Sequence, residues 1–223
     1  MSETTPTDRP LDEQVRFEIV DEVAWITIDR PEKGNALSPP CRNRIRDLIN
    51  GLNGAHTARA IVLTASGEKL FCPGADLSHR VPSERPEGVP ERVVGDARRM
   101  MLEGQYTLFP AILDSELPII AAVNGTAAGM GAHLAFACDL VIAAEGTKFI
   151  EVFSRRGLVV DALGAYLLPR TIGLHKAKEL VLFGDDLPVA ANLRWPLTSS
   201  SMAATTCSVA CSPYGYGNAA SSA

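Results

Sequence analysis

The chain has 223 residues, 46% of them hydrophobic and only 6% aromatic, which is typical of one globular domain long enough to bury a large core. Its 21 basic and 26 acidic residues give a net charge of −5, which argues against a nucleic-acid partner, and no apolar run reaches the roughly 18 residues that a membrane-spanning helix needs. Five cysteines without a Cys-x-x-Cys pair, behind a polar N-terminus unlike a secretory signal, predict reduced thiols, a cytoplasmic location and no membrane partner.

The first part of the chain predicts a leader, a hairpin and a helix. Residues 1–13 are polar, and we expect them to be a disordered leader ahead of one domain at 14–190. Strand-forming residues at 16–20 and 23–29 flank an Asp-Glu pair, which predicts a hairpin. Ser38 precedes two prolines, a helix-start signal. The apolar residues that follow with helical spacing are Ile45, Leu48, Ile49 and Leu52.

Apolar strands and helical segments alternate through the rest of the domain. Residues 66–77 form a loop rich in Gly and Pro, and residues 81–91 predict a mobile loop. The expected strands are 60–65, 118–123 and 139–144. The first expected helix is 91–114, with a break near Phe109-Pro110. A second is opened by the Gly/Ala turn 125–131 and runs through 137. Two more are expected at 163–168 and 174–183, with Pro169 in the break between them. This alternation predicts an α/β fold whose sheet is covered on both faces.

The composition changes near the C-terminus. Arg194 is the last charged residue, and the residues after it are rich in Ser, Thr and Ala. We expect 191–223 to be an uncharged, low-complexity and disordered tail that arises from a truncated or frame-shifted gene end. An intact longer reading frame in another frame of the nucleotide sequence would support this hypothesis.

Three separate segments carry the chemical signal. They are RPEKGNAL at 30–37, FCPGADL at 71–77 and AAVNGTAAGMGAHLAFACDLVIAA at 121–144. Each alone is weak, and neither a dinucleotide-binding GxGxxG nor a phosphate-binding GxxxxGK[ST] is present where one is needed. In this order and at this spacing, the three resemble the crotonase superfamily, the enoyl-CoA hydratase/isomerase group, over about residues 15–189.

The resemblance implies a fold, a substrate and an assembly. The fold is a crotonase-like spiral of ββα units, whose C-terminal helical segment would here be largely missing. The substrate is an acyl-CoA thioester, with no cofactor beyond the coenzyme A that forms part of it. The assembly is a homo-oligomer, a trimer or a dimer of trimers, which the altered C-terminus would impair.

The resemblance also implies an oxyanion hole. It places the two backbone N–H donors at Ala75 and Met130, where they would stabilise negative charge growing on the thioester oxygen. Gly74 and Gly129 would allow close backbone approach, because no side chain stands in the way. The alternative is that both glycines only shape turns.

Coenzyme A contacts follow from the same resemblance. Lys33 in the first segment is the expected phosphate contact, and the alternative is a solvated loop cation. Backbone around Ala36, Ala75, Asp76 and Leu77 would hold the pantetheine and the adenine.

The acid–base positions depart from the family pattern. Where related hydratases carry two glutamates, this chain has His133 and Phe153. Neither residue is acidic, so the resemblance does not support water addition by two glutamates. Glu151 lies two residues before Phe153, and we interpret it as a surface or structural carboxylate. His133 is either a second proton carrier or hydrogen-bond donor, or a satisfied histidine in the pocket wall.

Asp161 is the preferred acid–base candidate. It follows the otherwise apolar Gly157-Leu158-Val159-Val160, and related isomerases and chlorobenzoyl-CoA dehalogenases carry a functional Asp at the matching position. In an apolar pocket this carboxylate would shuttle a proton α to the thioester, or act as a nucleophile. The alternative is an N-cap for a helix that starts near Ala162.

The sequence therefore predicts enolate-stabilising chemistry on an acyl-CoA, with isomerase-type proton transfer preferred over hydration. A second hypothesis is a non-catalytic acyl-CoA-binding or scaffold protein, which the missing glutamates favour. The remaining histidines lack the spacing of metal ligands, so we expect no metal site.

Overall fold

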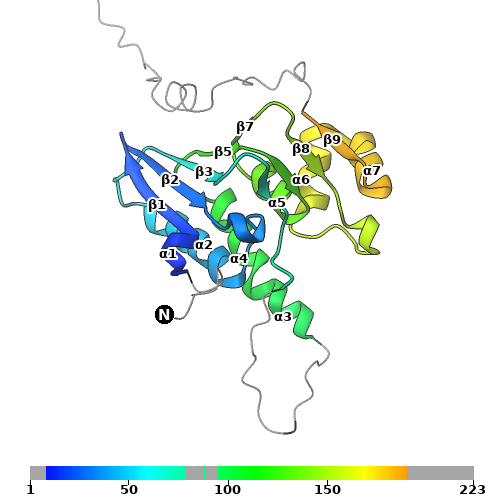
Figure 1. Ribbon diagram of the computed structural model, residues 1–223, viewed down its shortest axis with the longest axis horizontal. Helices are drawn as coiled ribbons and strands as arrows, with labels where there is room; N and C mark the ends of the chain where they lie inside the picture. The colour runs from blue at the N-terminus through cyan, green and yellow to red at the C-terminus, as the bar shows by residue number, and fades with distance from the viewer. Residues whose placement is uncertain (1–8, 79–87, 89–94, 190–223) are drawn as a thin grey trace, which may run out of the picture.

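Two β-sheets and the helices packed against them make up the computed structural model, which describes residues 9–78, 88 and 95–189 (Figure 1). The strands are β1 (Val15–Val20), β2 (Val23–Ile28), β3 (Ala60–Ala65), β4 (Leu70–Cys72), β5 (Ile119–Val123), β6 (Thr126–Ala128), β7 (Leu140–Ala143), β8 (Lys148–Ile150) and β9 (Asp186–Pro188). The helices are α1 (Leu11–Gln14), α2 (Pro39–Leu52), α3 (Asp96–Glu103), α4 (Gln105–Leu113), α5 (Met130–Phe136), α6 (Gly164–Ile172) and α7 (Leu174–Phe183). Short 3-10 turns lie at Pro31–Lys33 and Ser154–Arg156.

The larger sheet confirms the predicted hairpin and the three predicted apolar strands. Its strand order is β1-β2-β3-β5-β7, with β1 antiparallel to β2 and the other neighbours parallel. Successive side chains of a strand point to opposite faces. Ile61 and Leu63 of β3 therefore join the main core, while Val62 joins a second apolar cluster with Ile120 and Ile142 on the other face. Both faces of the sheet are thus apolar, as the sequence predicts.

The smaller sheet was not predicted. Its order is β4-β6-β8-β9, and each of these strands has three residues. Such segments are too short to show a periodic pattern, and two of them lie inside the predicted loop 66–77 and the predicted turn 125–131. This sheet matters for the site because β4 and β6 pair in parallel and lead directly into the two predicted oxyanion segments.

The helix breaks differ from the prediction. Pro110 and Pro169 lie inside α4 and α6, and the chain breaks instead at Gly104 and Gly173. A proline removes one helical hydrogen bond, whereas a residue outside the helical region of backbone angles ends the helix. Gly173 has φ +83° and Gly104 has φ −112° with ψ −93°, both outside that region.

The N-terminal helix extends the folded domain beyond its expected start. Residues 9–13, expected within the disordered leader, are folded, since α1 begins at Leu11 and Arg9 donates from Nη1 to the Asp29 carbonyl at 2.9 Å. Residues 1–8, the proline-rich loop except for Gly88, and the tail from 190 onward lie outside the described residues. Ser38 caps α2 as predicted, with its Oγ accepting from the Cys41 N–H at 3.4 Å.

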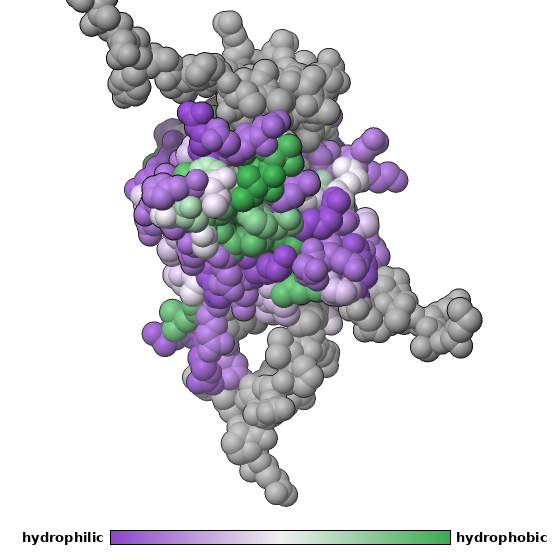
Figure 2. Space-filling view, turned by 90° about the vertical axis from the view of Figure 1, so that its left-hand side faces the viewer, coloured by the Kyte–Doolittle hydropathy of each residue, from purple (hydrophilic) through white to green (hydrophobic). Residues whose placement is uncertain are grey.

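The edge strand β1 presents apolar surface. Seen from the side where Figure 1 draws the β1–β2 hairpin, Figure 2 shows an apolar patch framed by hydrophilic residues. Phe17, Ile19 and Val20 of β1 are exposed. In the part of the chain that the structure describes, every helix is too short or too polar to span a bilayer.

Candidate active site

The first predicted oxyanion segment follows β4 and turns at Gly74. Gly74 has φ +109°, in the left-handed region that favours glycine. Leu37 bridges Ala75 in parallel, because its N–H donates to the Gly74 carbonyl and its carbonyl accepts from the Asp76 N–H, both at 2.9 Å. This bridge leaves the Ala75 N–H facing the other way, and no described residue accepts a hydrogen bond from it.

The second segment leads from β6 into α5. Gly129 has φ +52° and ψ −127°, and its N–H donates to the Ile150 carbonyl at 2.9 Å. Met130 is the first residue of α5, so its N–H has no carbonyl one turn earlier in the helix, and it meets no other acceptor among the described residues. Met130 thus offers a second unpaired backbone donor.

The two segments touch. A Cβ placed on Gly74 would lie 3.5 Å from the Met130 nitrogen, and one placed on Gly131 would lie 2.0 Å from the Cys72 carbonyl oxygen. The start of α5 can therefore approach the end of β4 only because residue 131 has no side chain. The structure thus brings the Ala75 and Met130 segments together.

Cys72 supports the first turn as a neutral thiol. Its Sγ accepts from the Gly74 N–H at 3.4 Å. Burial raises the pKa of this thiol to about 12, although the hydrogen bond from Gly74 acts in the opposite direction. The thiol therefore stays protonated near neutral pH, as a small buried side chain rather than a nucleophile.

His133 is paired with Glu151 inside the protein. Its Nε2 lies 2.9 Å and 3.1 Å from the two carboxylate oxygens of Glu151, and the side chains are 0% and 3% exposed. The sequence left open whether Glu151 is a surface carboxylate or a structural one. Its burial excludes the surface position. The Nδ1 of His133 is buried without a partner among the described residues.

The walls of the His133 pocket are Phe153 and Gly164. The Phe153 ring stacks on the imidazole with 5.6 Å between the ring centres and 8° between the planes. A Cβ on Gly164 would lie 2.1 Å from the His133 ring, so the glycine is needed for space. Phe153 also borders Gly129, since a Cβ there would lie 3.6 Å from the Phe153 ring. The two positions at which the resemblance implies glutamates in hydratases thus hold a stacked aromatic pair.

Asp161 has one hydrogen-bonded oxygen and one free oxygen. Its Oδ2 accepts from Nε2 of Gln105 at 3.3 Å, while its Oδ1 is buried without a partner among the described residues. The helix that follows, α6, begins at Gly164 with Leu163 at the capping position and no side-chain cap. The interpretation of Asp161 as a helix cap is therefore wrong.

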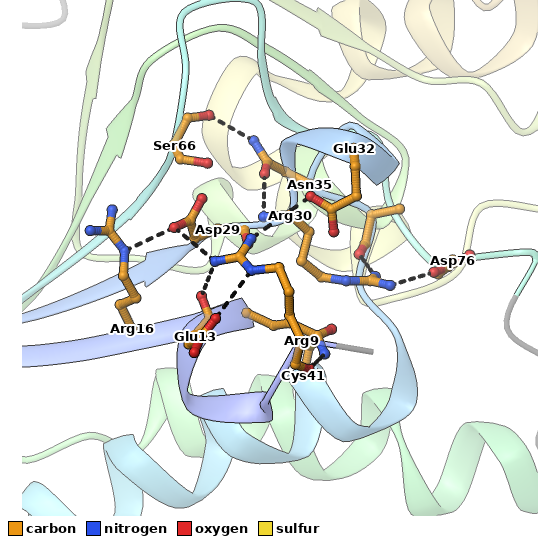
Figure 3. Close-up of polar contacts among 12 residues, drawn as sticks. Arg9, Glu13, Arg16, Asp29, Arg30, Glu32, Asn35, Cys41, Ser66 and Asp76 are labelled. Atoms are coloured by element: carbon orange, nitrogen blue, oxygen red, sulfur yellow. Dashed lines mark hydrogen bonds and ion pairs between the residues drawn. The ribbon is translucent and has the colours of Figure 1, made fainter. Parts of the chain in front are cut away.

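A buried polar network joins the first two motifs (Figure 3). The Arg30 guanidinium donates to the carboxylate of Asp76 at 2.9 Å, with both side chains almost fully buried, and to the Ala36 carbonyl. Asn35 donates from Nδ2 to the carbonyls of Ser66 and Leu70 at 2.9 Å and accepts from the Arg30 N–H at 3.0 Å. Arg30 and Asn35 thus fix the entry loop to the oxyanion segment.

The Asp76 carboxylate stays charged in this network. Burial disfavours its charged form, but hydrogen bonds from Ser78 and Arg30 outweigh that effect and hold the pKa of Asp76 below its usual range. The backbone groups that we expected to hold coenzyme A at Ala36 and Asp76 are partly used within the protein. The Ala36 carbonyl accepts from Arg30, and the Asp76 N–H donates to Leu37.

A cleft of about 400 Å³ opens beside this network. Its lining residues are Arg9, Leu11, Gln14, Arg30, Lys33, Ser38, Pro40, Asp76 and Ser78. Among the described residues, Lys33 reaches only the Ser78 hydroxyl, at 3.5 Å, whereas Arg9 and Arg30 are paired with carboxylates. Leu77 lies next to the cleft with 85% of its surface exposed. Among the described residues, no group of three or more His, Cys, Asp or Glu side chains could hold a metal ion.

Sequence reasoning missed several residues of this site. The sequence assigned no role to Arg30 and none to Gln105, and for Glu151 it offered a structural role, which the buried pair with His133 supports, without identifying the partner. Each of these side chains meets a partner that is distant in sequence, 46 residues away for Arg30 and 56 for Gln105. One feature of the site did leave a signal in the sequence. An N–H donor at Met130 does not itself need a glycine at 131, so the glycine there indicates a close backbone contact, which the structure shows with the Cys72 carbonyl.

Comparison with known proteins gives a consistent family assignment. A model of the enoyl-CoA hydratase/isomerase family matches residues 18–207. The 1,2-epoxyphenylacetyl-CoA isomerase of Escherichia coli (strain K12) is 36% identical over 174 residues, which cover 78% of this chain and 63% of that protein. Enoyl-CoA hydratase ACTT3 of Alternaria alternata is 33% identical over 82% of this chain and 58% of its own length.

Solved structures agree with these sequence matches. The crystal structure of an enoyl-CoA hydratase from Bacillus anthracis superposes with a TM-score of 0.70 at 30% identity, and the match covers 79% of this chain and 65% of that one. The chain spans about three fifths of the length of the curated relatives it matches. The family match also runs past residue 190, where we expected the domain to end.

Gly131→Ala tests the contact between the two oxyanion segments. The added methyl group would overlap the Cys72 carbonyl, so we expect a loss of about 1–3 kcal/mol in the free energy of unfolding. Urea denaturation measures it. Gly51→Ala is the matched control, because a Cβ on this α2 glycine meets no atom within 4 Å, and this change should be neutral or stabilising. Equal effects at the two glycines would contradict the packing described above.

Glu151→Ala tests the buried pair. Removing the carboxylate leaves the buried His133 Nε2 without its partner, and we expect a loss of about 1–3 kcal/mol in the free energy of unfolding. Glu151→Gln keeps an oxygen that can accept from Nε2, so its loss should be clearly smaller. Chemical denaturation of both variants measures the difference, and a Glu151→Ala protein as stable as the wild type would show that the pair does not form.

Proposed function

Because the chain belongs to the enoyl-CoA hydratase/isomerase family, we propose that it binds an acyl-CoA thioester and stabilises an enolate-like state of it. The membership and the likeness to solved enoyl-CoA hydratases also confirm the crotonase-like α/β fold. The observation that carries the proposal is the pair of unpaired N–H groups at Ala75 and Met130 on two segments in contact. Donors fixed before the reaction stabilise charge that develops on the thioester oxygen, at no cost of reorganisation.

Asp161 is the proposed proton carrier. The family's two glutamate positions hold His133 and Phe153, and the His133 ring is fully buried against Phe153 and Gly164. Asp161, by contrast, is partly exposed and has a carboxylate oxygen that no described residue contacts by a hydrogen bond. Likeness to a protein named as an isomerase also supports proton transfer over hydration. His133 then acts as a wall of the site rather than as a second proton carrier.

Lys33 is the proposed phosphate contact of coenzyme A. The cleft beside it is lined by three basic side chains, of which Arg9 and Arg30 are already paired with carboxylates. Lys33, which has no carboxylate partner in the part of the chain that the structure describes, therefore contributes a positive charge that an anionic phosphate group can meet. The only cofactor chemistry in this proposal is the coenzyme A of the substrate, and the homo-oligomeric assembly and the cytoplasmic location remain predictions.

A non-catalytic acyl-CoA-binding protein is the second candidate. The replacement of both glutamate positions by an aromatic pair is the observation that favours it. The two candidates share the oxyanion donors and the cleft, and they differ in whether Asp161 moves a proton.

Asp161→Asn separates the two candidates. The amide cannot take up a proton, so we expect turnover of a panel of enoyl-CoA substrates to fall about 100-fold or more. Asp185→Asn is the matched control, an exposed aspartate at the end of α7 that should leave turnover unchanged. Full activity of Asp161→Asn would show that the assigned base is wrong. Binding of an acyl-CoA by calorimetry with no turnover by the wild type would favour the non-catalytic candidate.

Lys33→Ala tests the phosphate contact. Loss of a charge-assisted contact should raise the Kd for free coenzyme A about tenfold, and the difference should shrink as salt is added. Isothermal titration calorimetry at two salt concentrations measures both effects. Lys178→Ala removes an exposed lysine on α7 and serves as control. If both lysine variants bind coenzyme A as the wild type does, the cleft is not the phosphate site.

A further inference from the structure

We propose that Gln105 is a positioning residue that orients the Asp161 carboxylate, an inference that rests on the proposed function. Gln105 Nε2 donates to Asp161 Oδ2 at 3.3 Å, and Asp161 Oδ1 is left without a partner among the described residues. The amide thus restrains one carboxylate oxygen and leaves the other available for a proton.

Gln105 stands on a fixed part of the fold. It is the first residue of α4, directly after the break at Gly104. The helix behind it is anchored by Leu108, Phe109 and Ile112, which are buried in the main core. A side chain at this end of α4 therefore projects from a rigid support rather than from a loop.

Asp161, by contrast, lies on irregular backbone. Ala162 and Leu163, the two residues after it, have φ +48° and +62°, in the region that non-glycine residues seldom occupy. The Asp161 carbonyl accepts from the Gly164 N–H at 2.8 Å, which closes a tight turn before α6. No strand or helix fixes the direction of its side chain, so the contact with α4 supplies that direction.

The neutral character of the partner suits a proton carrier. No described basic side chain forms an ion pair with Asp161. A neighbouring Arg or Lys would hold the carboxylate in its charged form and weaken it as a base. An amide N–H orients the same carboxylate with a weaker electrostatic effect, because the donor carries no net charge.

Exchange of the α-protons of butyryl-CoA in D2O, followed by NMR, tests this role. Gln105→Met keeps the length of the side chain and removes the donor, so we expect kcat for exchange to fall about tenfold while KM changes by less than about twofold. Gln105→Glu has a similar size and also lacks the N–H donor, so it should lower kcat at least as much. This second variant keeps the test valid if the Met variant does not fold. In the Asp161→Asn background, Gln105→Met should cause no further loss, because the two residues act as one unit.

The control is Asn53→Ala. Asn53 also makes one amide hydrogen bond, in which its Oδ1 accepts from the Glu116 N–H at 3.1 Å at the far end of α2, so its exchange rate should equal that of the wild type. A wild-type kcat in both Gln105 variants, or a further loss in the Asp161→Asn background, would overturn the positioning role alone. A wild type that catalyses no exchange, or an Asp161→Asn protein that exchanges at the wild-type rate, would instead overturn the proposed function and this inference with it.

Discussion

The close approach of α5 to the end of β4 is the constraint on which the candidate site depends. Two backbone N–H groups can serve one oxygen only if their segments come within a few ångströms of each other. Gly74 and Gly131 permit this approach, because a side chain at 131 would overlap the Cys72 carbonyl. The short parallel pairing of β4 with β6 then holds the two segments side by side. The donors are therefore set by the fold itself, before any ligand binds.

The polar side chains around this centre fall into two kinds. Arg30 with Asp76, and His133 with Glu151, are buried pairs whose members hold each other in place and fix the walls of the site. Lys33 lines the cleft and has no carboxylate partner among the described residues, and Asp161 keeps one carboxylate oxygen without a described partner. Buried pairs are costly to break, whereas Lys33 and Asp161 are partly exposed and can meet a ligand. This difference supports a structural role for the two pairs, and it is the basis on which a binding role is proposed for Lys33 and a chemical role for Asp161.

Much of the fold could be predicted from local patterns. The hairpin and the long apolar strands 60–65, 118–123 and 139–144 show their periodicity or run length directly. The two proposed donors, at Ala75 and Met130, came from the family resemblance rather than from a local pattern. The four strands of the smaller sheet could not be predicted, because three residues carry no pattern and form only by pairing with distant segments. Helix breaks were placed at prolines although glycines made them, since a proline in a short helix removes only one hydrogen bond. The pairing of Glu151 with His133, and of Gln105 with Asp161, could not be predicted for the same reason as the short strands. Their roles come from contacts across the fold that no local spacing reveals.

The most direct test of the central claim is the infrared carbonyl band of a bound acyl-CoA, isolated by ¹³C labelling of the thioester carbonyl. If the Ala75 and Met130 amides both donate to that oxygen, the band should move to lower wavenumber on binding, because two hydrogen bonds polarise the C=O bond. The measurement needs binding but no turnover, so it does not depend on which residue moves the proton. A carbonyl band at the same position in the bound and the free thioester would contradict the account.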